Sequence, residues 1–226
     1  YDMTADLDIR AYNGDNYYMW DAQQQYWYGY EWTKNLSAGT GQPTANGGSS
    51  SNYAQSNTDL RYWNEDDQGL NMSTPATHAP CKDLPNANEM SWYAANGDPR
   101  WDADELWTTM GHLYKGGMWF KKKIDISGFN ANTAVDGYDW RIIANTNSWS
   151  VSTTSLSAAD ASNYFYLPPS GYYNSGQLID VGVQGFYWSS TGVSSNNDAY
   201  YLRFSSSDVE MFGFPRSSGY RLGAFE

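Results

Sequence analysis

The chain has very little of the chemistry that covalent catalysis or metal binding requires. Its 226 residues include one cysteine, Cys81, and two histidines, His78 and His112. A single cysteine cannot form a disulfide within the chain, so thiols indicate no redox compartment. A cysteine nucleophile needs a nearby base, and although His78 comes shortly before Cys81, we expect a buried or incidental thiol. His112 has no second histidine or carboxylate at helical spacing, so we expect no metal ligand there.

Charged residues are few, and most of them are acidic. Charged residues make up 17% of the chain, the formal net charge is -12 and the isoelectric point is about 4.4. Nucleic-acid phosphates attract a footprint of lysine and arginine, so this composition argues against nucleic acid as a partner, and equally against anionic membrane surfaces. No apolar run approaches the roughly 20 residues of a transmembrane helix, and we find no signal peptide.

Aromatic and small polar residues are plentiful instead. The chain has 20 tyrosines and 11 tryptophans, which combine an apolar body with a polar group and suit recognition surfaces. Glycine, serine and asparagine favour loops and turns, and they concentrate in residues 37–59, where we expect a long surface loop. The length fits one large domain or two small ones.

The middle of the chain predicts two helices. Asn86 begins the first, which runs to about residue 95 with Glu89 as the partner in a capping box. Asp102 begins the second, with Glu105 three residues on and an apolar face at helical spacing. That face comprises Leu106, Met110 and Leu113. Strands and helices do not alternate regularly, so the pattern predicts an α+β fold rather than a parallel α/β fold.

Neighbouring carboxylates are predicted to serve structure. Asp102 with Asp104, and Asp66 with Asp67, are pairs that a hydrolase could use, but such pairs at helix starts and turns usually cap or meet solvent. Glu65, beside Asp66, lacks the alternating ladder of a calcium loop. We therefore predict no catalytic residue, no metal and no cofactor.

The last forty residues contain two short segments with period-2 alternation, the pattern of half-buried strands. Leu202 and Phe204 share one face of the first, and Val209 and Met211 share one face of the second. Residues 205–207 are short enough to join them as a hairpin. The other face has no common chemistry, which is typical of a binding surface. It carries Arg203, Ser205, Asp208, Glu210, Phe212, Phe214 and Pro215.

The same region carries a line of motifs. They are Leu167-Pro168-Pro169-Ser170-Gly171-Tyr172-Tyr173, Gly176-Gln177-Leu178, Gly185-Phe186-Tyr187-Trp188-Ser189-Ser190-Thr191, Ala199-Tyr200-Tyr201-Leu202 and Arg216-x-x-Gly219-Tyr220-Arg221. These resemble a bacterial C-type-lectin-like domain family that includes the Fibrobacter succinogenes major paralogous domain. The ending resembles the variable region of proteins diversified by diversity-generating retroelements. The segment 81–123 is similar to surface and pilus-tip-like proteins of the Bacteroides group.

The resemblance implies an α+β architecture, a C-type lectin fold of the formylglycine-generating-enzyme-like subtype. It would form a single domain over residues 1–226, with two helices, mixed short strands and a C-terminal display hairpin. Residues 185–226 would be the variable ligand-binding region. Formylglycine generation uses a pair of cysteines, and this chain has one. The calcium-dependent sugar motifs of animal lectins are also missing from the sequence, so we expect no enzyme and no metal.

The resemblance also assigns residues to two sets. The scaffold signature falls on Trp188, Ser189, Ser190, Leu202, Phe204, Val209, Arg216 and Gly219. The ligand-binding set falls on Arg203, Ser205, Asp208, Glu210, Phe212, Phe214, Pro215, Ser217 and Ser218, on Ser194, Ser195 and Asn196 in the preceding loop, and on Tyr200 and Tyr201 as anchors. An asparagine codon randomised at both adenines cannot yield glutamate. Glu210 therefore needs a lysine-type template codon, or it is not diversified.

The function implied is that of a ligand-binding, adhesin-type protein on the outside of a bacterial cell, with its signal or anchor segment outside this chain. The ligand would be a protein or glycan on another cell or host surface, and pilus subunits would be further partners. The alternative is a structural or assembly domain of a pilus or surface layer without a variable ligand site. A hydrolase or glycan-processing enzyme is a weaker third hypothesis.

Overall fold

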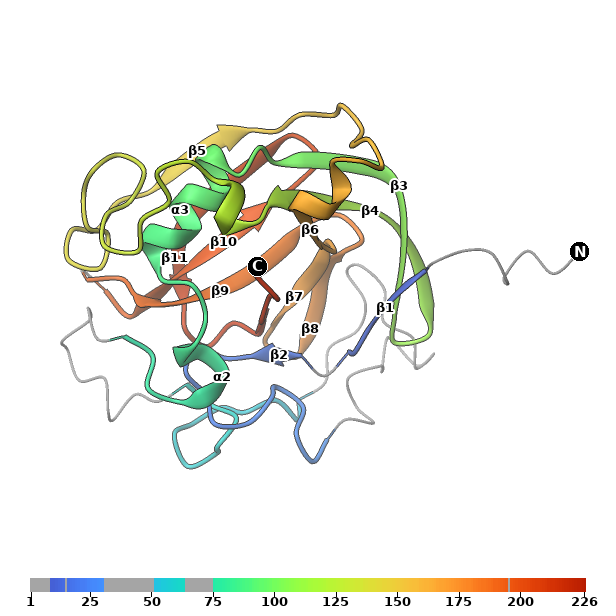
Figure 1. Cartoon of the computed structure of the whole chain (residues 1–226). Helices are drawn as coiled ribbons and strands as arrows, with labels where there is room; N and C mark the ends of the chain where they lie inside the picture. Colours follow the sequence, from blue (N-terminus) through green and yellow to red (C-terminus); the bar gives the residue numbers. More distant parts are fainter. Residues whose placement is uncertain (1–8, 15, 31–50, 64–74, 195) are drawn as a thin grey trace, which may run out of the picture.

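Two β-sheets and one helix of ten residues form the framework of the protein. The computed structural model describes residues 9–14, 16–30, 51–63, 75–194 and 196–226 (Figure 1). The predicted loop at 37–59 lies outside the described residues up to residue 50, and turns and bends are found in 51–59.

The first sheet has four strands in the order β1-β3-β4-β6. They are β1 (Arg10–Tyr12), β3 (Arg100–Thr109), β4 (His112–Lys121) and β6 (Tyr164–Leu167). β1 runs parallel to β3, and the other neighbours are antiparallel.

The second sheet has eight strands, six of them in the order β2-β12-β9-β10-β11-β5. They are β2 (Tyr17–Tyr18), β12 (Tyr220–Arg221), β9 (Gly185–Gly192), β10 (Asp198–Phe204), β11 (Asp208–Pro215) and β5 (Asn147–Ser150). β7 (Ser170–Asn174) pairs with β8 (Gln177–Val181) and with β9. The C-terminal strands thus form the centre of this sheet, and strands from both halves of the chain flank them.

Helix α3 (Ala87–Asn96) begins at the predicted place. Asn86 Oδ1 accepts a hydrogen bond from Glu89 N at 3.1 Å, and Glu89 Oε2 accepts one from Asn86 N at 2.9 Å. The predicted capping box is therefore confirmed, because it depends only on residues three apart. A one-turn helix, α2 (Ala79–Lys82), and two 3₁₀ turns (Lys123–Asp125 and Ala161–Asn163) complete the helical part that the structure describes.

The inner core lies between α3, the first sheet and one face of β9, β10 and β11. Figure 1 shows α3 lying across β10 and β11. Met90 and Tyr93 of α3, Phe120 of β4, and Leu202 and Phe204 of β10 all belong to it and are fully or almost fully buried. Burial on this scale is the main stabilising term for the fold.

The second predicted helix is wrong, because its residues form the β3–β4 hairpin. Asp102 does cap a local turn, and its Oδ1 accepts hydrogen bonds from Asp104 N at 2.9 Å and Glu105 N at 3.2 Å. That turn lies where the β3–β4 register shifts, at a bulge rather than at a helix start. Met110 and Gly111 then take positive φ values of 51° and 80°, as a two-residue hairpin turn requires.

The predicted α+β fold class is wrong as well. Strands hold 38% of the described residues and helices 11%, which is a sheet-rich fold and does not fit an α+β C-type lectin fold with two helices. The predicted apolar face is not a buried face of a helix. Leu106 and Met110 are only partly buried, and Leu113 is 60% exposed on the paired strand.

The C-terminal hairpin is present as the alternation predicts. β10 and β11 pair antiparallel through seven residue pairs, from Asp198 with Pro215 to Phe204 with Val209. Residues 205–207 make the connection, where Ser205 N donates to Asp208 O at 2.9 Å. Leu202 and Met211 are opposite one another and completely buried.

The capping box provides a test of local stability. Asn86→Ala removes the side-chain oxygen that accepts a hydrogen bond from Glu89 N. It also removes Nδ2, which donates a hydrogen bond to Ala131 O at 3.0 Å. We expect a loss of about 1–2 kcal/mol in the free energy of unfolding, measured by urea denaturation. Asn86→Asp is the matched control, since it keeps the acceptor and should lose less. An alanine variant as stable as the parent would contradict the assignment.

Candidate functional site

The candidate site is the face of β10 and β11 that points away from the inner core, which we call the outer face. Three consecutive cross-strand pairs lie on it: Arg203 with Glu210, Tyr201 with Phe212, and Ala199 with Phe214. Cross-strand neighbours of this kind have Cβ atoms about 5 Å apart, so their side chains form one continuous row. The mixed set predicted from alternation is therefore brought together on this face along β10 and β11.

The charged end of the outer face is a closed network around Arg203. Its Nε donates to Glu210 Oε2 at 2.8 Å, its Nη2 to Asp208 Oδ2 at 2.9 Å, and its Nη1 to Gln184 Oε1 at 2.9 Å. Desolvation opposes the charge of Arg203, but the hydrogen bond to Glu210 and the two carboxylates outweigh it, and the pKa of Arg203 is raised. Ser205 Oγ donates to Asp208 Oδ1 and extends the network. Its members are thus held in fixed positions.

Gln184 is the member that the sequence did not predict. It lies just before β9, nineteen positions from Arg203, and no period-2 pattern links the two. Only the pairing of β9 with β10, which sets Arg203 opposite Phe186, brings it near.

The aromatic end of the outer face is partly covered. Tyr201 lies with its ring centroid 5.0 Å from that of Tyr220 and 6.1 Å from that of Phe186. Phe214 stacks on Tyr220 at 6.0 Å, while both Phe212 and Phe214 stay partly exposed. These rings belong to what we call the outer aromatic cluster, packed beside Trp20, Cys81, Trp188 and Ala199. A ligand could therefore contact Phe212 and Phe214 but little of Tyr201.

Three members of the predicted ligand-binding set are buried. Tyr200 is 0% exposed and points to the inner core, where its hydroxyl accepts a hydrogen bond from Asn145 N at 3.0 Å. Tyr201 is 7% exposed because the outer aromatic cluster covers it, and desolvation raises its pKa to about 12. Ser218 is 4% exposed. The prediction that the two tyrosines anchor a ligand is corrected accordingly.

The rest of the predicted set is dispersed. Pro215 is exposed at the end of β11, and Ser217 lines a separate cavity of about 250 Å³ with Met19 and Tyr53. Asn196 is exposed and lines a cavity of about 290 Å³ beside Phe212. Ser194 is partly exposed, and Ser195 lies outside the described residues.

The residues of the scaffold signature are all buried. They are Trp188, Ser189, Ser190, Leu202, Phe204, Val209, Arg216 and Gly219. Trp188 stacks on Tyr220 at 4.2 Å and donates from Nε1 to Tyr18 O at 2.8 Å. Gly219 has no room for a side chain, because a Cβ would lie 2.6 Å from the ring of Tyr26.

Arg216 is buried behind the hairpin. Its guanidinium lies 4.4 Å from the ring centroid of Trp20, and its Nε donates to Asp198 O at 3.1 Å. Desolvation lowers its pKa to about 10, against the opposing attraction of Asp21 and Asp198. A charge this deeply placed ties the end of β11 to the N-terminal segment.

Cys81, His78 and Asp21 lie together, but in an arrangement without a nucleophile. Cys81 is 0% exposed and its sulfur accepts a hydrogen bond from Asp21 N at 3.3 Å. Asp21 Oδ1 accepts from the backbone of Thr77 and His78 and also lies 3.5 Å from His78 Nδ1, so the carboxylate holds this turn in place. The His78 ring contacts Asp21 O at 2.7 Å. Burial raises the pKa of the Cys81 thiol to about 12.

The predicted carboxylate pair has structural partners as well. Asp102 holds the bulge of β3, and Asp104 forms an exposed ion pair with Lys115 at 2.6 Å. The acidic cluster at 65–67 lies outside the described residues. Among the residues that the structure describes, no three of His, Cys, Asp and Glu gather as a metal site would need. Within the same residues, no helix has the length and apolar character to span a membrane.

Comparison with known proteins adds no relative: no protein-family model, curated protein or solved structure matches the chain.

The state of Cys81 can be tested directly. Because the thiol is buried and stays protonated below its raised pKa of about 12, native protein at pH 8 should react with iodoacetamide very slowly. We expect labelling at least ~100-fold slower than in urea, followed by mass spectrometry. Rapid labelling of the native protein would show a reachable thiolate and contradict this assignment.

The Arg203 network predicts a measurable coupling. In a double-mutant cycle with Arg203→Met and Glu210→Gln, we expect a coupling free energy of about 1 kcal/mol, because the side chains are only 16% and 23% exposed. The matched control is the Lys115–Asp104 pair, whose side chains are 60% and 86% exposed, and for which we expect no measurable coupling. Equal coupling in both cycles would mean that the outer face is not specially ordered.

Proposed function

We propose that this protein is a non-enzymatic, adhesin-type ligand-binding protein whose site is the outer face of β10 and β11. The observation that carries the proposal is the contrast between two faces of one hairpin. Leu202, Phe204, Val209 and Met211 are completely buried, while Arg203, Ser205, Asp208, Glu210, Phe212 and Phe214 remain partly exposed on the other side. A backbone ordered before binding presents such side chains at low entropic cost.

The chemistry of the outer face indicates the kind of ligand. Phe212 and Phe214 offer apolar area, and the Arg203 network offers one cation flanked by two carboxylates. Aromatic residues and arginine are the side chains that most often dominate binding energy, and neighbouring charges select the partner. A protein or glycan surface that combines an apolar patch with hydrogen-bonding groups would match it.

We also propose that a retroelement diversifies residues 185–226, so that specificity changes while the fold is kept. Outer-face positions can change without opening the inner core, because their side chains do not enter it. Tyr201 and Ala199 are exceptions for another reason, since both are buried in the outer aromatic cluster. Display of this kind suits a protein on the outside of a bacterial cell, with other surface or pilus subunits as neighbours. Glu210 fits diversification only from a lysine-type template codon, and its partner Arg203 gives it a structural reason to be retained.

Two libraries test the proposal without knowledge of the natural ligand. One randomises the outer face at Arg203, Ser205, Asp208, Glu210, Phe212 and Phe214. The matched library randomises Leu202, Phe204, Val209 and Met211. Displayed on yeast and challenged with protease, most outer-face variants should stay folded, whereas most inner variants should be cleaved, because a buried large-to-small change costs about 2–5 kcal/mol. Selection on lysozyme and serum albumin should then yield binders from the first library only.

Two outcomes would contradict the proposal. The first is that outer-face variants unfold as often as inner ones, which would make that face part of the core. The second is that the purified parent chain self-associates in sedimentation and loses this association when the outer face is changed. That result would support the alternative function, an assembly domain of a pilus or surface layer.

A further inference from the structure

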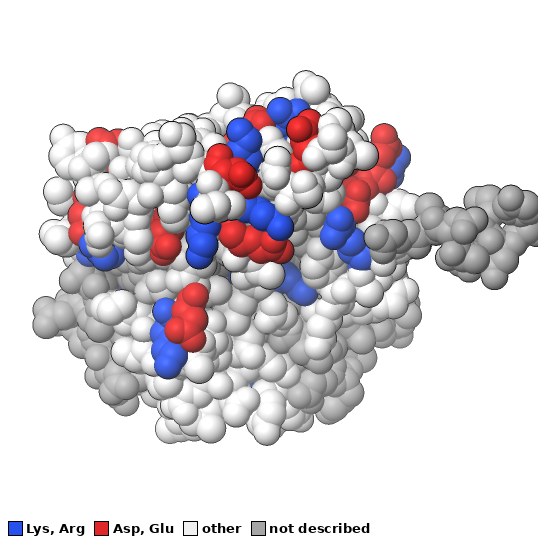
Figure 2. Space-filling view, in the orientation of Figure 1, with Lys and Arg blue, Asp and Glu red and all other residues white. Residues whose placement is uncertain are grey.

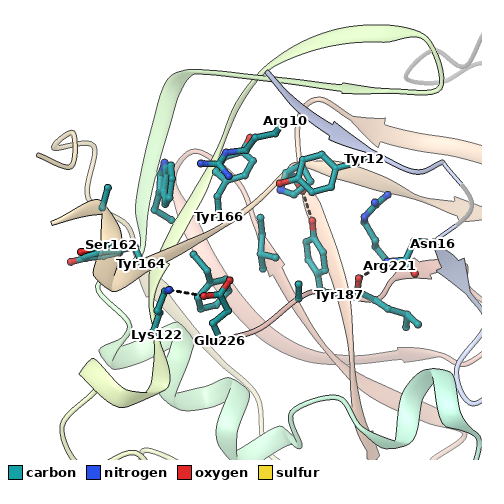
Figure 3. A pocket seen from close by; sticks show the side chains of 18 residues that line it. Arg10, Tyr12, Asn16, Lys122, Ser162, Tyr164, Tyr166, Tyr187, Arg221 and Glu226 are labelled. Atoms are coloured by element: carbon teal, nitrogen blue, oxygen red, sulfur yellow. Dashed lines mark hydrogen bonds and ion pairs between the residues drawn. The ribbon is translucent and has the colours of Figure 1, made fainter. Parts of the chain in front are cut away.

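A third cavity lies on the opposite side of the eight-stranded sheet from the outer face. It has a volume of about 560 Å³ and is lined by residues of β1, β4, β6, β9, β12 and the segment after β12 (Figure 3). Ser162 and Ala224 at its rim are exposed, while Tyr187, Leu167 and Arg221 are buried. The volume is within the range of small-molecule sites, and the floor is buried.

Arg221 is the unusual residue in this cavity. It is 4% exposed, and its Nη1 is buried without a hydrogen-bond partner. Its guanidinium lies 5.3 Å from the ring centroid of Tyr12 and 5.5 Å from that of Tyr17. No carboxylate among the described residues forms an ion pair with it. Tyr17 shares a side-chain hydrogen bond with Arg221, but a neutral hydroxyl does not compensate the charge. A buried cation without an anion is costly, so the lack of an anionic partner among the described residues calls for an explanation.

The other cations of the cavity are already neutralised. Arg10 Nε pairs with Glu105 Oε1 at 2.8 Å, and Lys122 Nζ pairs with Glu226 Oε2 at 2.7 Å. Figure 2 shows the same pairing of opposite charges on this face of the molecule, where most lysine and arginine atoms lie beside aspartate or glutamate atoms. Within the part of the chain that the structure describes, Arg221 therefore leaves the cavity with one uncompensated positive charge.

The tyrosines of the wall do not supply the missing anion. Desolvation raises the pKa of Tyr12 to about 12, and desolvation also raises the pKa values of Tyr166 and Tyr187. The hydroxyls of Tyr166 and Tyr187 already have partners, since Tyr166 donates to Gly116 O at 2.7 Å and Tyr187 to Pro168 O at 2.6 Å. These side chains stay neutral and offer ring surface to whatever enters.

We infer that this cavity binds a small carboxylate carried on a six-membered ring, with the carboxylate against Arg221. A carboxylate matches the planar fork of a guanidinium and compensates its charge. The aromatic walls suit a flat ring, and the ring side chains of Tyr12, Trp119, Tyr166 and Tyr187 line the cavity together. An aromatic acid and a sugar acid share this chemistry.

The site is independent of the proposed recognition function. Tyr187 lies on the inner face of β9, whereas Phe186 and Trp188 on either side of it belong to the outer aromatic cluster. A ligand can occupy the cavity without touching β11. Loss of one activity would therefore leave the other measurable.

Isothermal titration of the full chain tests the inference with four probes. Benzoate and glucuronate carry the carboxylate, and benzamide and glucose are their neutral counterparts. We expect saturable binding of at least one acid and of neither neutral probe. Arg221→Met should weaken the binding of that acid by at least about tenfold. The melting temperature of the protein should not fall, because the substitution also removes a buried charge that no anion compensates. Lys115→Gln removes an exposed charge that does not line the cavity and should leave the binding of the acid unchanged.

Three outcomes would overturn the inference. In the first, neither acid binds saturably up to about 10 mM. In the second, an acid and its neutral counterpart bind equally well. In the third, the Arg221→Met variant binds the acid as tightly as the parent does. If the methionine variant fails to fold, Arg221→Lys takes its place, since it keeps the charge and loses the planar fork. We then expect weakening of at least about threefold, and affinity equal to the parent's would overturn the inference.

Discussion

The structure depends on burying both faces of β9. All eight of its residues are buried, with Tyr187 in the inner core and Phe186 and Trp188 in the outer aromatic cluster. A central strand covered on both sides fixes the register of its neighbours, because a slip of one residue would exchange the two sets of side chains. The pairing of β10 and β11 follows from this, and so does the separation of Leu202 and Met211 from Arg203 and Glu210.

The outer aromatic cluster also limits which side chains of the outer face a ligand could reach. Tyr201 is buried within the outer aromatic cluster, whereas Phe212 packs against the edge of that cluster and stays partly exposed. The network of Arg203, Asp208 and Glu210 is partly exposed as well. Binding is therefore expected from β11 and the charged end of the hairpin more than from the two tyrosines of β10. On the inner side there is a cavity with the buried Arg221 in its lining, so the two sites that we propose lie on opposite faces of one sheet and differ in chemistry.

Local signals in the sequence predicted local structure. The capping box at Asn86 and the alternation of the C-terminal hairpin were sufficient, since each involves residues a few positions apart. The β3–β4 hairpin was missed because Asp102 satisfies backbone amides in a bulge as it would at a helix start. The burial of Tyr201 and the unpaired charge of Arg221 come from segments far apart in the chain, and no pattern within one segment indicates them.

The central claim is that the outer face of β10 and β11 varies for recognition while the inner face keeps the fold. Sequencing the DNA that surrounds the gene tests it most directly. The account predicts a reverse transcriptase gene beside a near-copy of codons 185–226 that differs mainly at adenines, in codons for outer-face positions such as Arg203, Asp208 and Phe212. The absence of such a copy, or differences concentrated at Leu202 and Met211, would contradict it.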